Sequence, residues 1–214
     1  MNEIKIDKIT QTKQGRMALF CGEEFLFSVD TETYFLEHLS VGMSFTPEEL
    51  ESLWQRSELR KAKDKALQYL SLRDYASGEL YDKLRLKFDD HTAAAAVAAM
   101  RELGLLNDEA FALHRAKYLM AHSKSRSQVR RHLAEKGIGR DTIETVLEQL
   151  YEPDETGMRP DVEAAFRLVQ KSYASKLRAG KRENVLAALA RRGFSLSDSR
   201  EAIEIWQQEQ NDPE

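Results

Sequence analysis

The fold is decided by residues 129–150, which read VRRHLAEKGIGRDTIETVLEQL. Counting from Ile138, apolar side chains recur at offsets of five, eight, nine and twelve residues, which places them on one face of an α-helix. They are Ile143, Val146, Leu147 and Leu150. Gly139 is an acceptable N-cap for this helix, and Val129 and Leu133 mark another helix before it. The stretch therefore predicts a helical hairpin.

The same spacing occurs twice more in the chain. Counting from Phe88 it gives Ala93, Ala96, Val97 and Met100, and counting from Phe194 it gives Ser199, Ala202, Ile203 and Trp206. Another periodic segment precedes each hairpin, and these segments cover residues 62–70, 111–120 and 162–177. One match alone would fit an ordinary amphipathic helix, but three matches in register favour three tandem three-helix units.

The first 30 residues have a different pattern, in which apolar and polar side chains alternate with a period of two. Gly15 and Gly22 lie at the natural turns, so we expect a three-stranded meander followed by a short helix after Asp30. Thr46 and Pro47 then predict a capped helix start. The charged stretch 58–64 is expected to be an exposed connector into the first repeat.

The predicted fold is thus mainly α-helical, with a small β-meander and helix at the N-terminus. We expect this extension over residues 1–58, and the three-helix repeats over residues 59–106, 107–152 and 160–210. Pro153, Gly157 and Pro160 mark the linker before the third repeat.

Composition limits the functions open to this chain of 214 residues. Its hydrophobic content of 42% and charged content of 32% are typical of a folded, charge-rich protein. Cys21 is the single cysteine and the longest apolar run, 93–100, is too short to span a bilayer, so we expect a cytoplasmic protein without a membrane role. The net charge of −4 gives no general argument for nucleic-acid binding.

The sequence holds no catalytic or metal-binding motif of the phosphate-loop, zinc-protease, nucleophile-elbow or paired-cysteine type. The five histidines are scattered singly, and nothing near Cys21 in sequence would activate its thiol. We therefore expect no enzyme activity, no cofactor and no bound metal.

Basic and acidic side chains alternate in blocks that follow the repeats. Residues 111–140 hold eight basic side chains against one acidic one, residues 141–163 are mostly acidic, and residues 167–192 are mostly basic again. Stacked units would line up their basic helices along one side, which suits an extended polyanion or an acidic protein partner. The alternative is that opposite charges pair within each unit. The predicted contact residues are Arg126, Arg130, Arg131, Lys136, Lys181, Arg182, Arg191 and Arg192.

Three strings resemble the RecX family of RecA recombinase regulators. They read ALQYLSLRDY at 66–75, LGLLNDEAFA at 103–112 and RRHLAEKGI at 130–138, within a resemblance that spans about residues 62–150. The third repeat fits the family more loosely. The corner at 86–88 departs from the family pattern, because it reads Leu-Lys-Phe, one residue shorter than usual and without glycine.

The resemblance implies helical modules in an elongated, curved body that lies in the groove of the RecA filament on single-stranded DNA. It also implies inhibition of strand exchange, ATP hydrolysis and repressor self-cleavage, and so a role in DNA repair and the SOS response. We expect a monomer with indirect or weak contact to the single strand.

Two other kinds of protein remain open. Paired helices with a glycine-bearing turn could form a direct DNA-binding module similar to helix-turn-helix units, although the third helix of each unit is acidic. A scaffold without effect on the recombinase is the other alternative.

Overall fold

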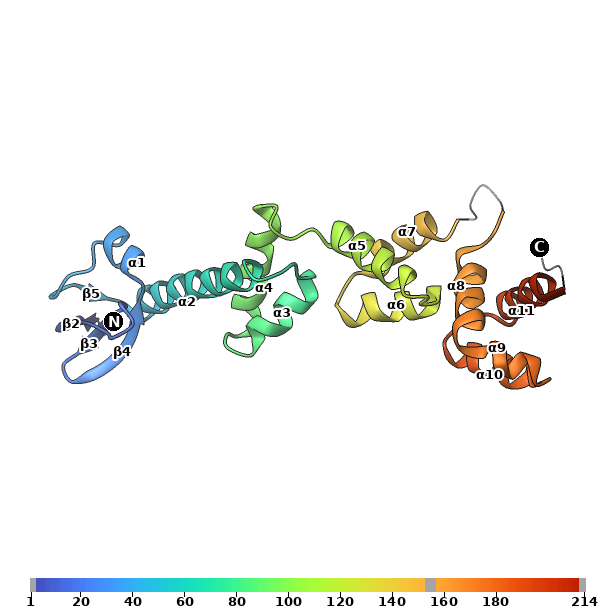
Figure 1. The fold of residues 1–214 in the computed structure, drawn as a ribbon. Helices are drawn as coiled ribbons and strands as arrows, with labels where there is room; N and C mark the ends of the chain where they lie inside the picture. Colours follow the sequence, from blue (N-terminus) through green and yellow to red (C-terminus); the bar gives the residue numbers. More distant parts are fainter. Residues whose placement is uncertain (1–2, 153–156, 212–214) are drawn as a thin grey trace. The chain divides into compact units, whose positions relative to one another are not determined.

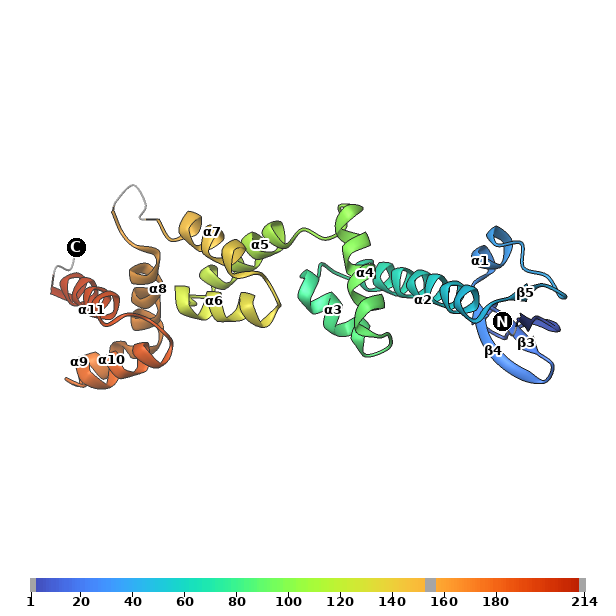
Figure 2. The same ribbon diagram turned by 180° about the vertical axis from the view of Figure 1, so that it is seen from behind.

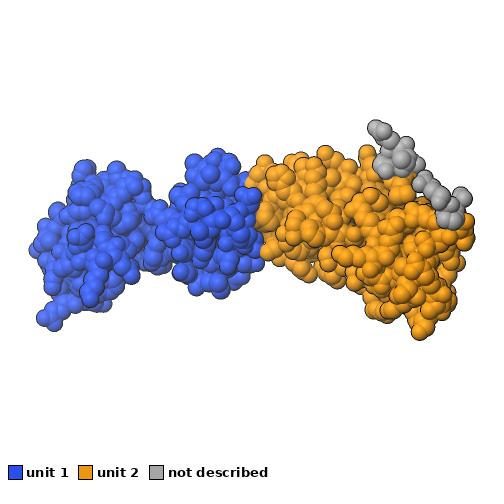
Figure 3. Space-filling model, viewed as in Figure 1, with its two compact units in different colours: residues 1–75, 79–106 blue, residues 76–78, 107–214 orange. Residues whose placement is uncertain are grey.

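The computed structural model describes residues 3–152 and 157–211, so Pro153 of the predicted linker lies outside the described residues. The chain divides into two compact units (Figure 3). Unit 1 comprises residues 1–75 and 79–106, and unit 2 comprises residues 76–78 and 107–214. The fold is mainly helical, as predicted, with small sheets at the N-terminus.

The N-terminal part of unit 1 is built on the predicted meander. Strands β2 (Lys8–Gln11), β3 (Met17–Cys21) and β4 (Glu24–Val29) form an antiparallel sheet in that order. A second pair, β1 (Ile4–Lys5) with β5 (Ser44–Phe45), was not predicted. The expected short helix is α1 (Thr31–Leu36), capped by the side chain of Asp30. Ile6, Leu19, Val29, Leu39 and Leu53 form the core of this part.

Helix α2 (Pro47–Leu70) corrects the prediction of an exposed connector at 58–64, because it continues through this stretch without a break. The Thr46 capping box predicted for its start is confirmed. Ala62 and Ala66 are fully buried and Leu59 packs beside them, and this apolar face keeps the charged stretch helical while Lys61 and Asp64 are exposed. One end of α2 carries the strands and the other carries the next two helices (Figures 1 and 2).

The first three-helix group contains the second half of α2, then α3 (Ser77–Arg85) and α4 (Asp90–Glu102). The shortened corner between α3 and α4 closes without a left-handed residue: the amides of Lys87 and Phe88 both donate to the carbonyl of Leu84. Phe88 remains half-buried there. The equivalent anchors Ile138 and Phe194 are only 5% and 4% exposed.

The second and third groups lie in unit 2. The second group contains α5 (Asp108–Ala121), α6 (Arg126–Glu135) and α7 (Arg140–Leu150). The third begins with α8 (Pro160–Leu168), the π-helical turn η1 (Val169–Tyr173) and α9 (Ala174–Arg178). It ends with α10 (Arg182–Arg191) and α11 (Leu196–Asn211).

The repeated apolar face is confirmed in both of these groups. Ile143, Val146 and Leu147 are buried in one, and Ala202, Ile203 and Trp206 in the other. Gly137 and Gly193 end the second helices at φ values of +74° and +81°, as expected for left-handed C-caps.

One kind of joint occurs twice in unit 2. An aspartate near the start of a first helix accepts a hydrogen bond from the first backbone amide of the preceding second helix. Asp161 Oδ1 is 2.8 Å from the amide nitrogen of Arg126, and Asp108 Oδ1 is 2.7 Å from that of Ser77. Each contact satisfies an amide that the helix itself leaves unpaired.

A glycine corner completes each joint. Gly137 packs so closely on Gly78 that a Cβ atom at Gly137 would lie 2.6 Å from the Gly78 Cα. Gly193 similarly packs against the side chains of Ser125 and Ser127, and Ser125 Oγ donates to the carbonyl of Arg192 over 2.8 Å. These contacts fix how α6 meets the C-terminal end of α10.

Substitutions at Asp161 are expected to separate its hydrogen bond from its charge. Asp161→Ala leaves the Arg126 amide without its acceptor and should lower the free energy of unfolding by about 1–2 kcal/mol. Asp161→Asn retains an acceptor oxygen, and burial raises the pKa of the native carboxyl, so this variant should be no less stable than the native protein at neutral pH. Urea unfolding of both variants measures the effect.

Asp141→Ala is the matched control, because Asp141 is the second residue of α7 as Asp161 is the second residue of α8. A raised carboxyl pKa means that the folded state binds the proton more readily, so the native protein should gain stability relative to Asp161→Asn as the pH falls from neutral. Equal losses in the alanine and asparagine variants would show that the charge, rather than the hydrogen bond, holds the joint.

Candidate functional site

The eight predicted contact residues lie on the second helices of unit 2 or at their caps, and two pairs, Arg126 with Arg182 and Lys136 with Arg192, occupy corresponding positions. Arg126, Arg130 and Arg131 belong to α6, and Lys136 is its C-cap. Arg182 and Arg191 belong to α10, which Lys181 and Arg192 flank as N-cap and C-cap. The structure thus gathers them into two groups of four, one on each second helix.

Two of the eight are engaged by the acidic third helices. Arg130 makes a two-pronged ion pair with Glu144 of α7, with Nε–Oε1 and Nη2–Oε2 distances of 2.7 and 2.8 Å. Arg182 Nη2 lies 3.3 Å from Glu204 Oε1 of α11. The bond to Arg130 holds the pKa of the Glu144 carboxyl below its usual value. For these two arginines the structure supports pairing within the unit.

Arg126 serves the joint between the helices of unit 2. It is half-buried, and its guanidinium lies 5.8 Å from the ring centre of Tyr151. Burial raises the pKa of the Tyr151 hydroxyl, so this ring stays neutral. Arg131, by contrast, is an exposed residue whose Nε lies 3.8 Å from Glu135 Oε1, a loose surface pair. Lys136 is half-buried at the end of α6.

Lys181, Arg191 and Arg192 are exposed, and no carboxylate of residues 3–152 or 157–211 lies within ion-pair distance of them. The guanidinium of Arg192 rests 5.9 Å from the ring centre of Tyr173. Because no ion pair has to be broken before a partner binds, these side chains are the best candidates for an electrostatic contact.

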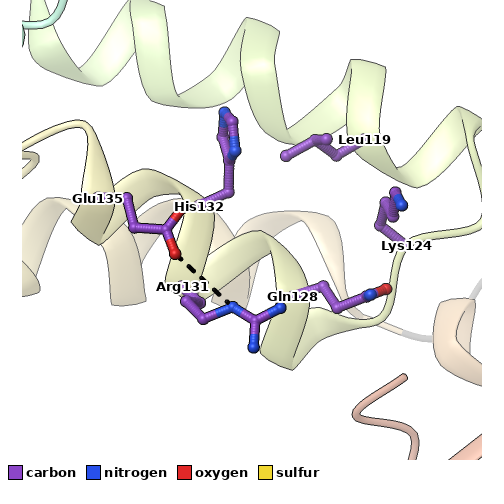
Figure 4. Close-up of a pocket in the computed structure, with 6 residues that line it drawn as sticks. All are labelled: Leu119, Lys124, Gln128, Arg131, His132 and Glu135. Carbon is purple, nitrogen blue, oxygen red and sulfur yellow. Dashed lines mark ion pairs between the residues drawn. The ribbon is translucent and has the colours of Figure 1, made fainter. Parts of the chain in front are cut away.

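A shallow pocket of about 320 Å³ adjoins Arg131, between α5 and α6. Figure 4 shows Lys124, Gln128 and Arg131 along its rim, with His132 directed from α6 toward α5. Arg115 Nε donates to His132 Nε2 over 2.9 Å, so this ring nitrogen is unprotonated. The hydrogen-bond donors of Lys124, Gln128 and Arg131 suit a polar or acidic side chain of a partner protein.

Sequence reasoning did not select Lys124, Gln128 or His132 as site residues. Gln128 lies three residues before Arg131, which is the spacing of one face of α6, and this signal could have found it. Lys124 lies in the connection before α6, where helical spacing gives no signal.

Two kinds of site are absent from the described part of the chain. None of its helices combines the length and the apolar character needed to cross a membrane. Nor do three or more His, Cys, Asp or Glu side chains of these residues gather where they could hold a metal ion.

Comparison with known proteins gives consistent results. Residues 62–99 match the family model "RecX, first three-helix domain", and residues 107–147 match "RecX, second three-helix domain". Regulatory protein RecX of Lactobacillus delbrueckii subsp. bulgaricus is 30% identical, over 87% of this chain and 69% of the relative. The RecX protein of Caldanaerobacter subterraneus subsp. tengcongensis is 28% identical, over 92% and 96%.

Two crystal structures share the fold. One is of a regulatory protein RecX and has a TM-score of 0.68, with 22% identity over 94% of this chain and 98% of the other. The other is of RecX from Lactobacillus salivarius and has a TM-score of 0.61, with 22% identity over 71% and 97%.

Proposed function

Because the chain belongs to the RecX family of regulatory proteins, we propose that it binds the RecA filament on single-stranded DNA and inhibits the filament's activities. The activities concerned are strand exchange, ATP hydrolysis and assistance to repressor self-cleavage, and the protein would thereby tune DNA repair and the SOS response. The family is one of regulators rather than enzymes, so binding itself is the mechanism.

The observation that carries the proposal is that α6 and α10 both begin at an arginine and end in a basic C-cap, with Arg126 matching Arg182 at the first position and Lys136 matching Arg192 at the C-cap. The two helices belong to successive repeats, and the joint between the repeats includes two bonds between a side chain and the main chain, from Ser125 Oγ to the Arg192 carbonyl and from the Arg126 amide to Asp161 Oδ1. A surface that repeats in this way fits a partner whose subunits also repeat, as those of a filament do. Lys181, Arg191 and Arg192 would supply the electrostatic attraction to acidic subunit surface or exposed phosphate.

A direct DNA-binding module is the rival function. Sequence-specific readout requires a helix that presents hydrogen-bonding side chains to base edges. The outer face of α7 instead carries the exposed carboxylates of Asp141 and Glu148, together with Glu144, which is paired with Arg130. Phosphate would be repelled by these carboxylates. The acidic third helices therefore favour a protein partner over duplex DNA.

The test is ATP hydrolysis by RecA on single-stranded DNA, titrated with the native protein and with an Arg191→Glu/Arg192→Glu variant. We expect inhibition by the native protein, and a half-inhibitory concentration about tenfold higher for the variant, since each reversal turns attraction into repulsion. The thermal melting temperature should stay within the scatter of the native value because neither side chain is buried or paired with a carboxylate of the described chain.

Arg140→Glu/Arg200→Glu is the matched control, with the same change in net charge placed on the third helices α7 and α11. It should inhibit as the native protein does. Reversal at Arg130 is less suitable, because it would set two carboxylates against each other at Glu144. Absence of inhibition by the native protein, together with tight DNA binding without RecA, would refute the proposal in favour of the DNA-binding module.

A further inference from the structure

A polar cleft of about 530 Å³ lies in unit 1, apart from the surface formed by α6 and α10. Four segments that are distant in sequence line it, and one of them, the start of α1, contributes Asp30 and Thr31. The β2–β3 turn contributes Gln14 and Arg16, α2 contributes Lys61 and Lys65, and the α3–α4 corner contributes Lys87 and Phe88.

The wall formed by the β2–β3 turn is fixed to α2. Arg16 Nη2 donates to Ser57 Oγ over 3.0 Å and to the Ser28 carbonyl over 2.6 Å, and Ser57 is fully buried. The carbonyl of Gly15 accepts a hydrogen bond from Thr31 Oγ1. Since these contacts use side chains of three elements, the cleft is a built feature rather than a gap between loose loops.

Phe88 distinguishes this cleft from the corresponding corners of the other repeats. Ile138 and Phe194 occupy the same position in the repeat pattern and are buried in their cores. Phe88 is half-buried and lines the cleft instead. The shortened corner places it without a left-handed glycine, whereas Gly137 and Gly193 precede Ile138 and Phe194. The first repeat thus leaves an aromatic ring partly exposed at a position where the other two repeats bury an apolar side chain.

Lysines surround the aromatic side chains of this region. Lys61 Nζ lies 5.8 Å from the ring centre of Phe88, and Lys65 Nζ and Lys83 Nζ lie 5.0 and 5.9 Å from that of Tyr69. Lys87 is exposed at the corner. Lysine contacts of this kind contribute little to stability at exposed positions, so folding alone gives a weak reason to gather these charges.

The acidic groups of the cleft are mostly engaged elsewhere. Asp30 caps α1 through its bond to the amide of Thr33 and faces Arg60. Lys61 is paired over 3.2 Å with Glu58, which does not line the cleft. Asp64 also lines the cleft and offsets one lysine. Lys65 and Lys87, which make no ion pair within the described part of the chain, leave the cleft net positive.

We propose that this cleft binds single-stranded nucleic acid, with phosphates at Lys65 and Lys87 and a base against Phe88. Lysines attract phosphates without regard to sequence, and an aromatic face stacks on any base. This site would add a direct nucleic-acid contact to the proposed protein contact of unit 2, and it stands independently of that contact.

The experiment measures binding of a fluorescent oligothymidylate of about 12 nucleotides by anisotropy, without RecA and over a range of salt concentrations. The variants are Lys65→Gln/Lys87→Gln and Phe88→Leu in the full chain. We expect each to weaken binding about fivefold or more. The slope of log affinity against log salt should fall by about 0.7 for each lysine removed, and it should stay unchanged in Phe88→Leu.

Arg140→Gln/Arg200→Gln carries the same change in charge on the third helices α7 and α11, outside both proposed contact surfaces, and should bind the oligonucleotide as the native protein does. Loss of binding in this control, with native affinity in both cleft variants, would overturn the proposal, and so would absence of binding by the native protein. The lysine variant keeps the test valid if Phe88→Leu fails to fold. RecA inhibition is measured separately, so failure of either proposal is visible without the other.

Discussion

Gly137→Ala is expected to lower the free energy of unfolding of unit 2 by about 2–5 kcal/mol, as the sum of two effects. The left-handed backbone at Gly137 costs a residue with a Cβ atom about 1–2 kcal/mol. The new Cβ would also lie 2.6 Å from the Gly78 Cα, and relieving such a contact costs about 1–3 kcal/mol because main-chain atoms must move. Urea-induced unfolding followed by circular dichroism measures the change.

Gly180→Ala separates the two effects. Gly180 has the same φ of +74°, but a Cβ there would meet nothing within 4 Å. It should therefore show the backbone cost alone, about 1–2 kcal/mol. If the two variants lose the same amount of stability, the close approach of Gly137 to Gly78 contributes nothing to the joint.

Leu133→Ala should have an effect of similar size through the core. Leu133 is fully buried among the apolar side chains of α5, α6 and α7, and the truncation leaves a cavity that this packed group cannot close. We expect a loss of about 2–5 kcal/mol. The same unfolding measurement applies, with differential scanning calorimetry to show whether a separate transition shifts.

Leu196→Ala is the control for Leu133→Ala, because the same atoms are removed from a side chain that is 52% exposed. Its free energy of unfolding should change by about 0.5 kcal/mol or less. A loss at Leu133 no greater than that at Leu196 would mean that the second helix is not anchored through this residue.

Much of the helical fold could be predicted because burial imposes a period on the sequence. Ile203 and Trp206 lie on the buried face that the repeated offsets predicted, and even Ser199, a poor core residue by type, is only 1% exposed. The capping box at Thr46 could be predicted equally well, because its donors and acceptors lie within four residues. Such local patterns need no knowledge of distant contacts.

Other features depend on contacts between residues far apart in sequence. The charged run at 58–64 gave no sign that a single helix would continue through it from Pro47 to Leu70. The bond from the Arg126 amide to Asp161 spans 35 residues. The candidate site shows the same contrast between local and distant contacts. The helix positions of the basic residues could be predicted, but the sequence could not show whether Arg130 pairs with Glu144 or stays unpaired at the surface.

The uninterrupted helix α2 also sets an angle. Leu53 packs into the core beside the strands, and Ala62 packs into the core of the first three-helix group. The orientation of one core relative to the other therefore depends on the helical rotation between these two residues. Each residue of an α-helix advances the screw by about 100°. Inserting one residue between these positions would rotate the strands about the helix axis by more than a quarter turn. Inserting seven residues would return them almost to their original orientation, because seven residues make nearly two full turns. The length of this segment therefore determines a rotation as well as a distance, and evolution can change it only in steps close to whole turns.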